Sequence, residues 1–431
     1  MGVRNVPVVI GGAGLECAYA GSRDELVRRL AARESVAAQP WFASDREAAD
    51  LRLPGNPHHA RFFVGEAARL PVMERVQHVL ERVQHVLERV IAQALQGSNL
   101  DEAALCGPDV RVYLAGHGMR PDIGDFAGYE NRNDEEDLLY FPKLKQLSVA
   151  NYAQDELAHR LAVRYRLASP PVPIYTASCS AMSSLYLAWQ AIRAGLARRA
   201  LVVGWMQYTL QDIVFMGGQG VLSVGDSQPF SAQSGGMLPA DGACALLLEA
   251  ADDASGVGTS PRTHLASCVA YQSSGEASRA MSADFRAIAA TMERALEAAA
   301  LKPEDIACVV PHANGAPASD KSEAMAILRI WGKNGMPVVT YKGQTGYMSV
   351  CSGLLDLFAI TDALAKQEIL PAQTRLPLDD TLQIDVHANR AALPLAGGAI
   401  LKTTLGLDGS IVACVVTQGP LSGGLHEVRG S

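Results

Sequence analysis

Short apolar runs alternate along the chain with stretches in which apolar residues recur every three or four positions. Runs of the first kind predict strands, and the second spacing predicts helices. The first half predicts strands at residues 8–11, 110–115, 172–176, 200–204 and 242–249, and helices at 152–166 and 183–195. The second half predicts strands at 264–271, 306–311, 337–341 and 410–417, and helices at 283–300, 321–330 and 353–366. This alternation favours an α/β fold with mostly parallel sheets that are covered on both faces.

The order of the predicted elements is similar in the two halves, which indicates a duplicated fold with a pseudo-twofold axis. We expect the halves to span residues 1–255 and 256–431. A smaller repeat is literal, because ERVQHVL occurs at 74–80 and again at 81–87. Its valines and leucines at heptad spacing predict an amphipathic surface helix, since two heptads are too few to indicate a coiled coil.

The composition suits a large packed core, with 48% hydrophobic and 19% charged residues among 431. A net charge of -8 argues against non-specific binding of nucleic acid, because such binding needs a basic face. We find no secretory signal and no apolar run of the roughly 18 residues that a membrane span requires, so we expect a cytoplasmic protein. The eight cysteines are scattered without a CxxC pair, so we expect no disulfide framework, no metal site and no cofactor.

Cys179 lies where a predicted strand ends, in the segment Ile-Tyr-Thr-Ala-Ser-Cys-Ser-Ala-Met, just before a helix rich in small and apolar residues. A thiol at a helix N-terminus can be stabilised as a thiolate by the helix dipole. The neighbouring backbone N–H groups can help to hold an oxyanion. The alternative is a buried structural cysteine, and position alone does not decide between the two.

Three further segments combine strand ends with polar or glycine-containing turns. His312 follows a predicted strand, where α/β folds place ligands, and Asp320 and Glu323 lie at the start of the next helix. Lys342 ends the strand that is the second-half counterpart of the Cys179 strand. The turn at 406–409 precedes the last strand and is either a plain hairpin or a source of N–H groups for a site.

Taken together, these segments resemble the elongating β-ketoacyl synthases of the thiolase-like superfamily. Residues 176–180 are similar to the family's nucleophile motif, and His312, Asp320 and Glu323 have the spacing of its first His motif. Lys342, Gly346 and Gly353 fit its Lys-x-x-x-Gly-His motif. Residues 229–243 align with its middle Pro-Phe-Asp motif, and residues 406–409 with its Gly-Phe-Gly-Gly turn. The resemblance implies a thiolase-like fold, with two duplicated βαβαβ-type halves in a five-layer αβαβα sandwich.

The chain also departs from the family pattern. Tyr347 stands where the family has its second catalytic His. The middle motif has Ser231, Ser234 and Asp241 in place of Asp, Arg and Glu, and the terminal turn has Leu405, Leu407 and Asp408 in place of two Phe and a Gly.

The resemblance implies a condensing enzyme that joins a Cys179-bound acyl group to a malonyl thioester, as in fatty acid or polyketide synthesis. It assigns catalysis to Cys179, His312, Tyr347 and Lys342, support to Asp320 and Glu323, and the oxyanion and gating turn to Gly406, Leu407, Asp408 and Gly409. Two alternatives remain. One is a non-elongating acyltransferase that uses Cys179 and His312, and the other is a partner subunit like a chain-length factor.

The implied partners are an acyl carrier protein or coenzyme A thioesters, and a second subunit that is identical or related. By analogy the substrate tunnel passes near Met206, Tyr208, Phe215 and Met216, and carrier docking involves Arg193, Arg198 and Arg199. Ordinary packing, or a solvated helix end, is the alternative for each of these residues. His387 is a candidate for replacing the missing imidazole.

Overall fold

A computed structural model describes residues 6–35, 38–40, 61–62, 72–116, 154–223, 226–252, 262–272, 284–395 and 397–420. Within these ranges one sheet of eleven strands runs through the molecule. Its order is β12 (Asp385–Val386), β10 (Pro337–Val338), β9 (Ile306–Val310), β14 (Ala399–Leu405), β15 (Ser410–Gln418), β8 (Thr263–Gln272), β1 (Val8–Cys17), β7 (Gly242–Ala250), β6 (Arg199–Met206), β4 (Val110–Ala115) and β5 (Val172–Ile174). Two small pairs complete the strands: β2 (Gln39–Pro40) with β3 (Arg61–Phe62), and β11 (Glu368–Ile369) with β13 (Leu393–Pro394).

The sheet is internally symmetric. The series β1-β7-β6-β4-β5 and β8-β15-β14-β9-β10 have the same order and the same directions, and β1 meets β8 through the single pair Val9 and His264. The expectation of mostly parallel strands is wrong, because β7 and β15 are each antiparallel to both of their neighbours. A short turn at 406–409 links β14 to β15, and a turn of that length permits only antiparallel pairing.

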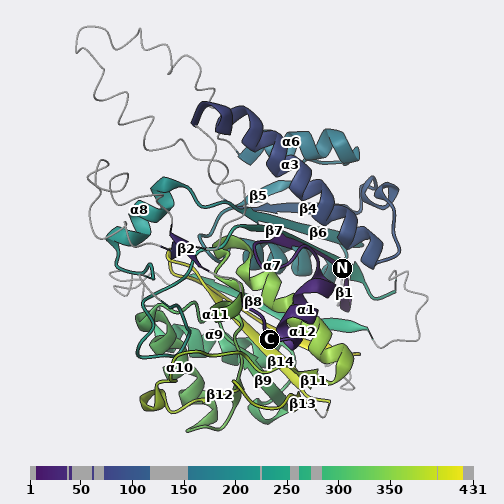
Figure 1. Cartoon of the computed structure of the whole chain (residues 1–431). Coiled ribbons are helices and arrows are strands. Elements are labelled where there is room, and N and C mark those ends of the chain that lie inside the picture. The colour runs from purple at the N-terminus through teal and green to yellow at the C-terminus, as the bar shows by residue number, and fades with distance from the viewer. Residues whose placement is uncertain are drawn as a thin grey trace.

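Helices cover both faces of the sheet. They are α1 (Arg23–Ala31), α3 (Val72–Gly97), α6 (Gln154–Tyr165), α7 (Ser180–Arg193), α8 (Leu210–Gly218), α9 (Phe285–Ala298), α10 (Pro317–Trp331), α11 (Lys342–Thr345) and α12 (Ser352–Lys366). Helices α7 and α12 pack on each other between the two halves of the sheet, while α3 and α6 cover one outer face and α9 and α10 the other. Figure 1 shows these five layers from α3 to α10, which confirms the expected αβαβα sandwich.

The literal repeat lies in the N-terminal part of α3, so the predicted amphipathic helix is confirmed. Val83 and Leu87 of the repeat, and Val90 just after it, are buried against the sheet. Gly12 and Gly14 of β1 allow this contact, because a Cβ on either would lie 1.8 Å from a carbonyl oxygen of α3. The helix is therefore a structural layer and not only a surface feature.

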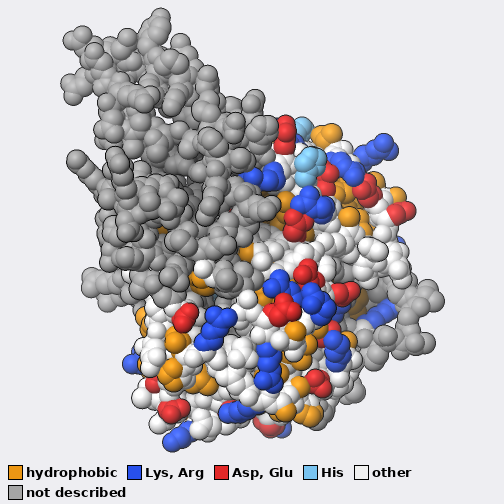
Figure 2. Space-filling model, viewed as in Figure 1, with side chains coloured by type: hydrophobic (Ala, Val, Ile, Leu, Met, Phe, Trp, Pro, Cys, Tyr) orange, Lys and Arg blue, Asp and Glu red, His pale blue; other side chains and the backbone are white. Residues whose placement is uncertain are grey.

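The outside of the molecule is mixed in charge. On the face in Figure 2, the described surface carries acidic and basic side chains close to one another. Exposed ion pairs such as Arg164–Glu102 stabilise a fold only weakly, so stability rests on the buried apolar layers. No helix among the described residues is long and apolar enough to cross a membrane. The boundary between the halves at residues 255 and 256 lies outside the described residues and stays a prediction.

Candidate active site

Cys179 is the N-cap of α7, as its place in the sequence predicts. The turn before it is tight, with Ala177 at a positive φ of 44°. The Ser180 hydroxyl fixes this turn, since it donates to the Ala177 carbonyl at 2.6 Å and accepts the Thr176 N–H at 3.0 Å. These contacts hold the backbone of the turn that presents Cys179.

A second turn of the same shape lies at the pseudosymmetric position. Cys351 is the N-cap of α12, and Ser349, two residues before it, has a positive φ of 41°. The two turns meet, with the Ser178 and Ser349 hydroxyls 3.2 Å apart. The Cys351 sulfur faces the other half of the sheet, where it lies 3.2 Å from a Cβ placed on Gly204.

The Cys179 thiol is fully buried, and either of two carbonyls of the C-terminal half can accept its single S–H. Its Sγ is 3.2 Å from the Thr404 oxygen and 3.4 Å from the Ser410 oxygen. Burial raises the pKa of Cys179 to about 12, and contributions from Ser410 and Lys402 only partly oppose it. Desolvation therefore opposes the thiolate that the α7 dipole is expected to stabilise. The thiol must lose its proton as it reacts, which requires a nearby base.

His312 is anchored through its backbone at the end of β9. Its N–H donates to Glu323 Oε1 at 2.7 Å, and the next N–H, that of Ala313, donates to Glu323 Oε2 at 2.6 Å. Asp320 accepts the N–H groups of Phe230 at 3.0 Å and Gly315 at 3.3 Å, which ties the middle motif to the His312 loop. Both acidic side chains on α10 thus position the loop, as their predicted supporting role requires.

Tyr347 lies against the imidazole. Its hydroxyl is 3.3 Å from His312 Nε2, and the two rings meet edge to face with centroids 5.4 Å apart. Burial raises the pKa of the Tyr347 phenol, and the Cys179 thiol is one of the groups that act on it. The phenol therefore contacts the imidazole and interacts electrostatically with the thiol.

The imidazole of His312 is held uncharged. Burial, followed by Lys342 and Lys402, lowers the pKa of His312 well below its usual value. Its Nδ1 has no hydrogen-bond partner among the described residues. A neutral imidazole accepts a proton on one nitrogen and donates from the other, so His312 can serve as a base or as a donor.

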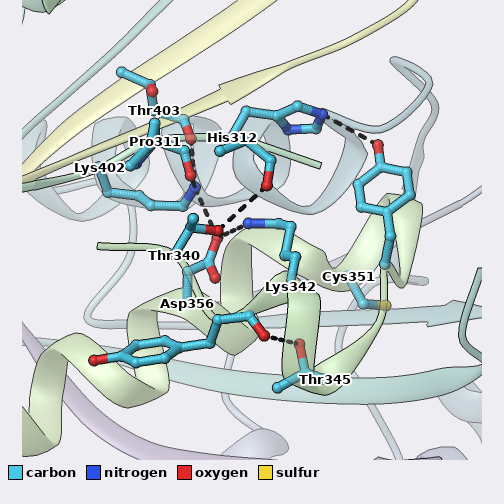
Figure 3. Close-up of polar contacts among 12 residues, drawn as sticks. Pro311, His312, Thr340, Lys342, Thr345, Cys351, Asp356, Lys402 and Thr403 are labelled. Atoms are coloured by element: carbon cyan, nitrogen blue, oxygen red, sulfur yellow. Dashed lines mark hydrogen bonds and ion pairs between the residues drawn. The ribbon is translucent and has the colours of Figure 1, made fainter. Parts of the chain in front are cut away.

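Lys342 does not contact the sulfur but belongs to a buried ionic cluster. Its Nζ is 2.6 Å from Asp356 Oδ2, and Lys402 Nζ is 2.9 Å from the same oxygen. Figure 3 shows the two lysines reaching this carboxylate from opposite sides, next to His312. Sequence reasoning missed Asp356 and Lys402. A charged residue inside each of the apolar runs LLDLFAI and AILKTTL was the available signal.

The turn at 406–409 closes the site from the C-terminal half. Its Gly406 N–H donates to Ser410 O at 2.8 Å, and the Gly409 N–H donates to Gly406 O at 3.0 Å. The Cys179 N–H donates to Thr176 O at 2.9 Å. Gly406 is required because a Cβ there would lie 2.3 Å from the Ser410 hydroxyl and 3.0 Å from Thr176 O. The backbone hydrogen bonds of the described residues leave the N–H groups of Leu407 and Asp408 without a turn partner.

The remaining predicted residues divide into two sets. Tyr208 lies behind the site, since its hydroxyl donates to the Tyr347 carbonyl at 3.0 Å, and Met206 and Met216 are buried while Phe215 is exposed. Of the docking candidates, Arg199 pairs with buried Glu249 at 3.0 Å, Arg193 lies over the Trp189 ring, and Arg198 lies 3.8 Å from Asp109. The charges acting on His387 come from Arg390 and Asp385, so the structure does not bring it to the thiol.

This fold and site define a class, that of the condensing enzymes with a thiolase-like fold. Residues 5–254 match the family model "Beta-ketoacyl synthase, N-terminal domain", and residues 265–375 match "Beta-ketoacyl synthase, C-terminal domain". The chain belongs to the β-ketoacyl synthase family.

Individual relatives are distant. The granaticin polyketide putative β-ketoacyl synthase 2 of Streptomyces violaceoruber is 30% identical over 194 residues, which are 42% of this chain and 45% of the relative. The highly reducing polyketide synthase sphB of Aspergillus fumigatus is 29% identical over 224 residues, or 50% of this chain. That match is only 9% of the relative, so the chain spans a small part of such large synthases.

Solved structures confirm the predicted fold. The ishigamide ketosynthase/chain length factor superimposes with a TM-score of 0.78 at 20% identity, covering 96% of this chain and 99% of that one. A type II acyl-carrier protein in complex with its ketosynthase gives a TM-score of 0.76 at 19% identity, covering 96% and 100%.

Proposed function

We propose that this chain is a ketosynthase that forms a carbon–carbon bond between an acyl group on Cys179 and a malonyl thioester. The observation that carries the proposal is the contact between the Tyr347 hydroxyl and His312 Nε2 at 3.3 Å, and the buried Cys179 thiol is one of the groups that act on this phenol. Family membership supports the reaction class.

In the first stage Cys179 attacks the carbonyl of a carrier-protein or coenzyme A thioester. Because the resting thiol is protonated, its proton passes to neutral His312, directly or through the Tyr347 hydroxyl. The proton then leaves with the departing thiol, so the acyl group is transferred without net loss of a proton. We assign the oxyanion contact to the N–H groups of Leu407 and Asp408, which donate no hydrogen bond within the 406–409 turn. We assign the gate of the acyl pocket to this turn as well.

In the second stage the malonyl group loses carbon dioxide, and the resulting enolate attacks the acyl-Cys179 carbonyl. The C–S bond to Cys179 then breaks, and the released thiolate takes up a proton from solvent. Negative charge develops on the malonyl thioester oxygen, where His312 and Tyr347 donate hydrogen bonds. Lys342 acts indirectly through Asp356, since it does not reach the sulfur.

A non-elongating acyltransferase is the second candidate, and Tyr347 is the feature that favours it. Loss of one oxyanion donor typically costs about a hundred- to a thousandfold in rate, and a neutral phenol replaces an imidazole only in part. A partner subunit without chemistry is the third candidate, and the retained Cys179 argues against it.

We also propose that the chain acts as a homodimer or a heterodimer with a related subunit, and receives acyl groups from an acyl carrier protein. The supporting feature is the sheet edge at β5, where Val172 is 46% exposed, next to Tyr175 at 54%. An open strand edge with apolar side chains is suited to pairing with another chain. The solved structures similar to this chain include a ketosynthase with its carrier protein and a ketosynthase/chain length factor.

The test is to incubate the protein with an acyl thioester and then with malonyl carrier protein. We expect an acyl mass shift on the Cys179 peptide, followed by carbon dioxide and β-ketoacyl product. Cys179→Ala should abolish all three signals, while Cys351→Ala, the matched change at the other N-cap, should retain them. Acylation without carbon dioxide release would exclude condensation and favour the acyltransferase, and no acylation would exclude both.

A further inference from the structure

Lys402 is a fully buried cation that the family resemblance does not single out. In the sheet its partner is Val310, the last residue of β9, two positions before His312. Its ammonium contacts Asp356 Oδ2 at 2.9 Å, the Pro311 carbonyl at 3.3 Å and the carbonyl of Thr403. These three acceptors match the three N–H groups of an ammonium, so the side chain is fully engaged.

Two lysines share one carboxylate oxygen in the cluster around Lys402, and Glu323 interacts electrostatically with both of them. Lys342 binds the same Asp356 oxygen at 2.6 Å, while Asp356 Oδ1 has no hydrogen-bond partner among the described residues. One carboxylate thus faces two ammonium groups. A buried ionic cluster contributes little to stability compared with apolar packing, so stability alone does not explain a second lysine here.

The neighbours of Lys402 hold the backbone of His312 on both sides. Pro311, whose carbonyl it binds, directly precedes His312. Thr403, the next residue of β14, donates its hydroxyl to Glu323 Oε1 at 2.9 Å, and the same carboxylate oxygen accepts the His312 N–H. The β14 strand therefore holds the backbone that carries the imidazole through two separate contacts.

We propose that Lys402 is a positioning residue for His312: it holds the Pro311 carbonyl, shares Asp356 with Lys342, and adds a buried positive charge to the cluster next to the imidazole. This inference rests on the proposed function, in which a neutral His312 accepts the Cys179 proton. The titratable groups around the imidazole come from several elements. They are Cys179 at the start of α7, Asp320 and Glu323 on α10, Lys342 on α11, Asp356 on α12, Lys402 on β14, and Tyr347 in the turn before η7 (Ser349–Cys351). Among them Lys342 and Lys402 lower the pKa of His312 after burial itself.

The experiment is an NMR titration of the full chain with labelled histidine, with the His312 signal assigned by its loss in His312→Gln. The wild type, Lys402→Met and Lys366→Met are compared from about pH 8 down to the lowest pH at which each stays folded, because the pKa of His312 lies well below its usual value. Lys366 is the matched control, because it lies on α12, pairs with Asp362 at 3.0 Å and is exposed. Removing Lys402 leaves a balanced Lys342–Asp356 pair, so we expect the variant to fold.

In Lys402→Met the midpoint of the His312 titration should rise by on the order of one pH unit, because a nearby buried positive charge is lost. Lys366→Met should leave it unchanged. Acylation of Cys179 should then fall on the acidic side only, whereas a purely structural role would lower the rate at every pH.

A folded Lys402→Met whose His312 titrates as in the wild type would overturn the proposal. If that variant does not fold, Lys402→Gln, which keeps a donor for Pro311 O, is titrated instead, and failure of both to fold would contradict the balanced-pair argument. The titration needs no substrate, so it separates failure of this inference from failure of the proposed function.

Discussion

Tyr347→Phe removes a single hydroxyl from the site and keeps the shape of the ring. The hydroxyl lies 3.3 Å from His312 Nε2, and Tyr347 is held by its backbone, with its N–H donating to Leu238 O at 2.8 Å and its carbonyl accepting the Ala240 N–H at 3.0 Å. The ring should therefore stay in place. Because the substitution removes one donor to the developing oxyanion, we expect decarboxylation of malonyl carrier protein to slow by about a hundred- to a thousandfold.

Stability should change much less than rate. One buried hydroxyl and its hydrogen bond contribute about 1 kcal/mol, so the free energy of unfolding should fall by roughly that amount. The assay is carbon dioxide release from acylated protein, with denaturant unfolding measured on the same samples. Tyr347→His, which restores the residue found in the family, should release carbon dioxide at least as fast as the wild type. An unchanged rate in Tyr347→Phe would refute a catalytic role for the phenol.

Three other outcomes follow from the geometry. Gly406→Ala places a Cβ 2.3 Å from the Ser410 hydroxyl and displaces the turn, so the rate of Cys179 acylation, measured by mass spectrometry, should fall roughly a hundredfold. Gly218→Ala should leave this rate unchanged, because nothing lies within 4 Å of its added Cβ, and equal rates in the two variants would contradict the role of the turn. Glu323→Gln loses one carboxylate oxygen that accepts a backbone N–H, and denaturant unfolding should show a loss of about 1–3 kcal/mol against none for exposed Glu297→Gln. Burial raises the pKa of Cys179 to about 12, so its thiolate fraction should rise about tenfold per pH unit between about pH 7 and 9, and so should its rate of alkylation by iodoacetamide. A plateau of that rate in this range would show that the thiolate is already formed.

The hydrophobic pattern predicted most of the elements that build the two halves. The strand at 110–115 is correct to the residue, and the helices at 152–166 and 353–366 are correct to within about two residues at each end. Strand direction was not predictable in this way, because a period of two residues is the same in parallel and antiparallel strands. Strand β14 was missed because Lys402, Thr403 and Thr404 are polar yet buried.

The candidate site was predicted in its members but not in its electrostatics. Motif spacing indicated that Cys179, His312 and Tyr347 meet, and the structure places the phenol against the imidazole. Spacing carries no information on burial, so it missed the rise in the pKa of Cys179. Asp356 and Lys402 were missed because their apolar surroundings in the sequence conceal them, and only the fold brings the two charges together. The catalytic roles themselves stay predictions.

The twin turns at Cys179 and Cys351 give this molecule an internal reference for reactivity. Each thiol is buried at the start of a central helix and follows a residue with positive φ, but Cys179 interacts with the Tyr347 phenol, whereas Cys351 lies beside the Cys244 thiol. Any difference in their labelling by one small electrophile, within a single sample, therefore measures how these two surroundings change the reactivity of a sulfur in the same backbone setting. That comparison needs no variant, no substrate and no second protein.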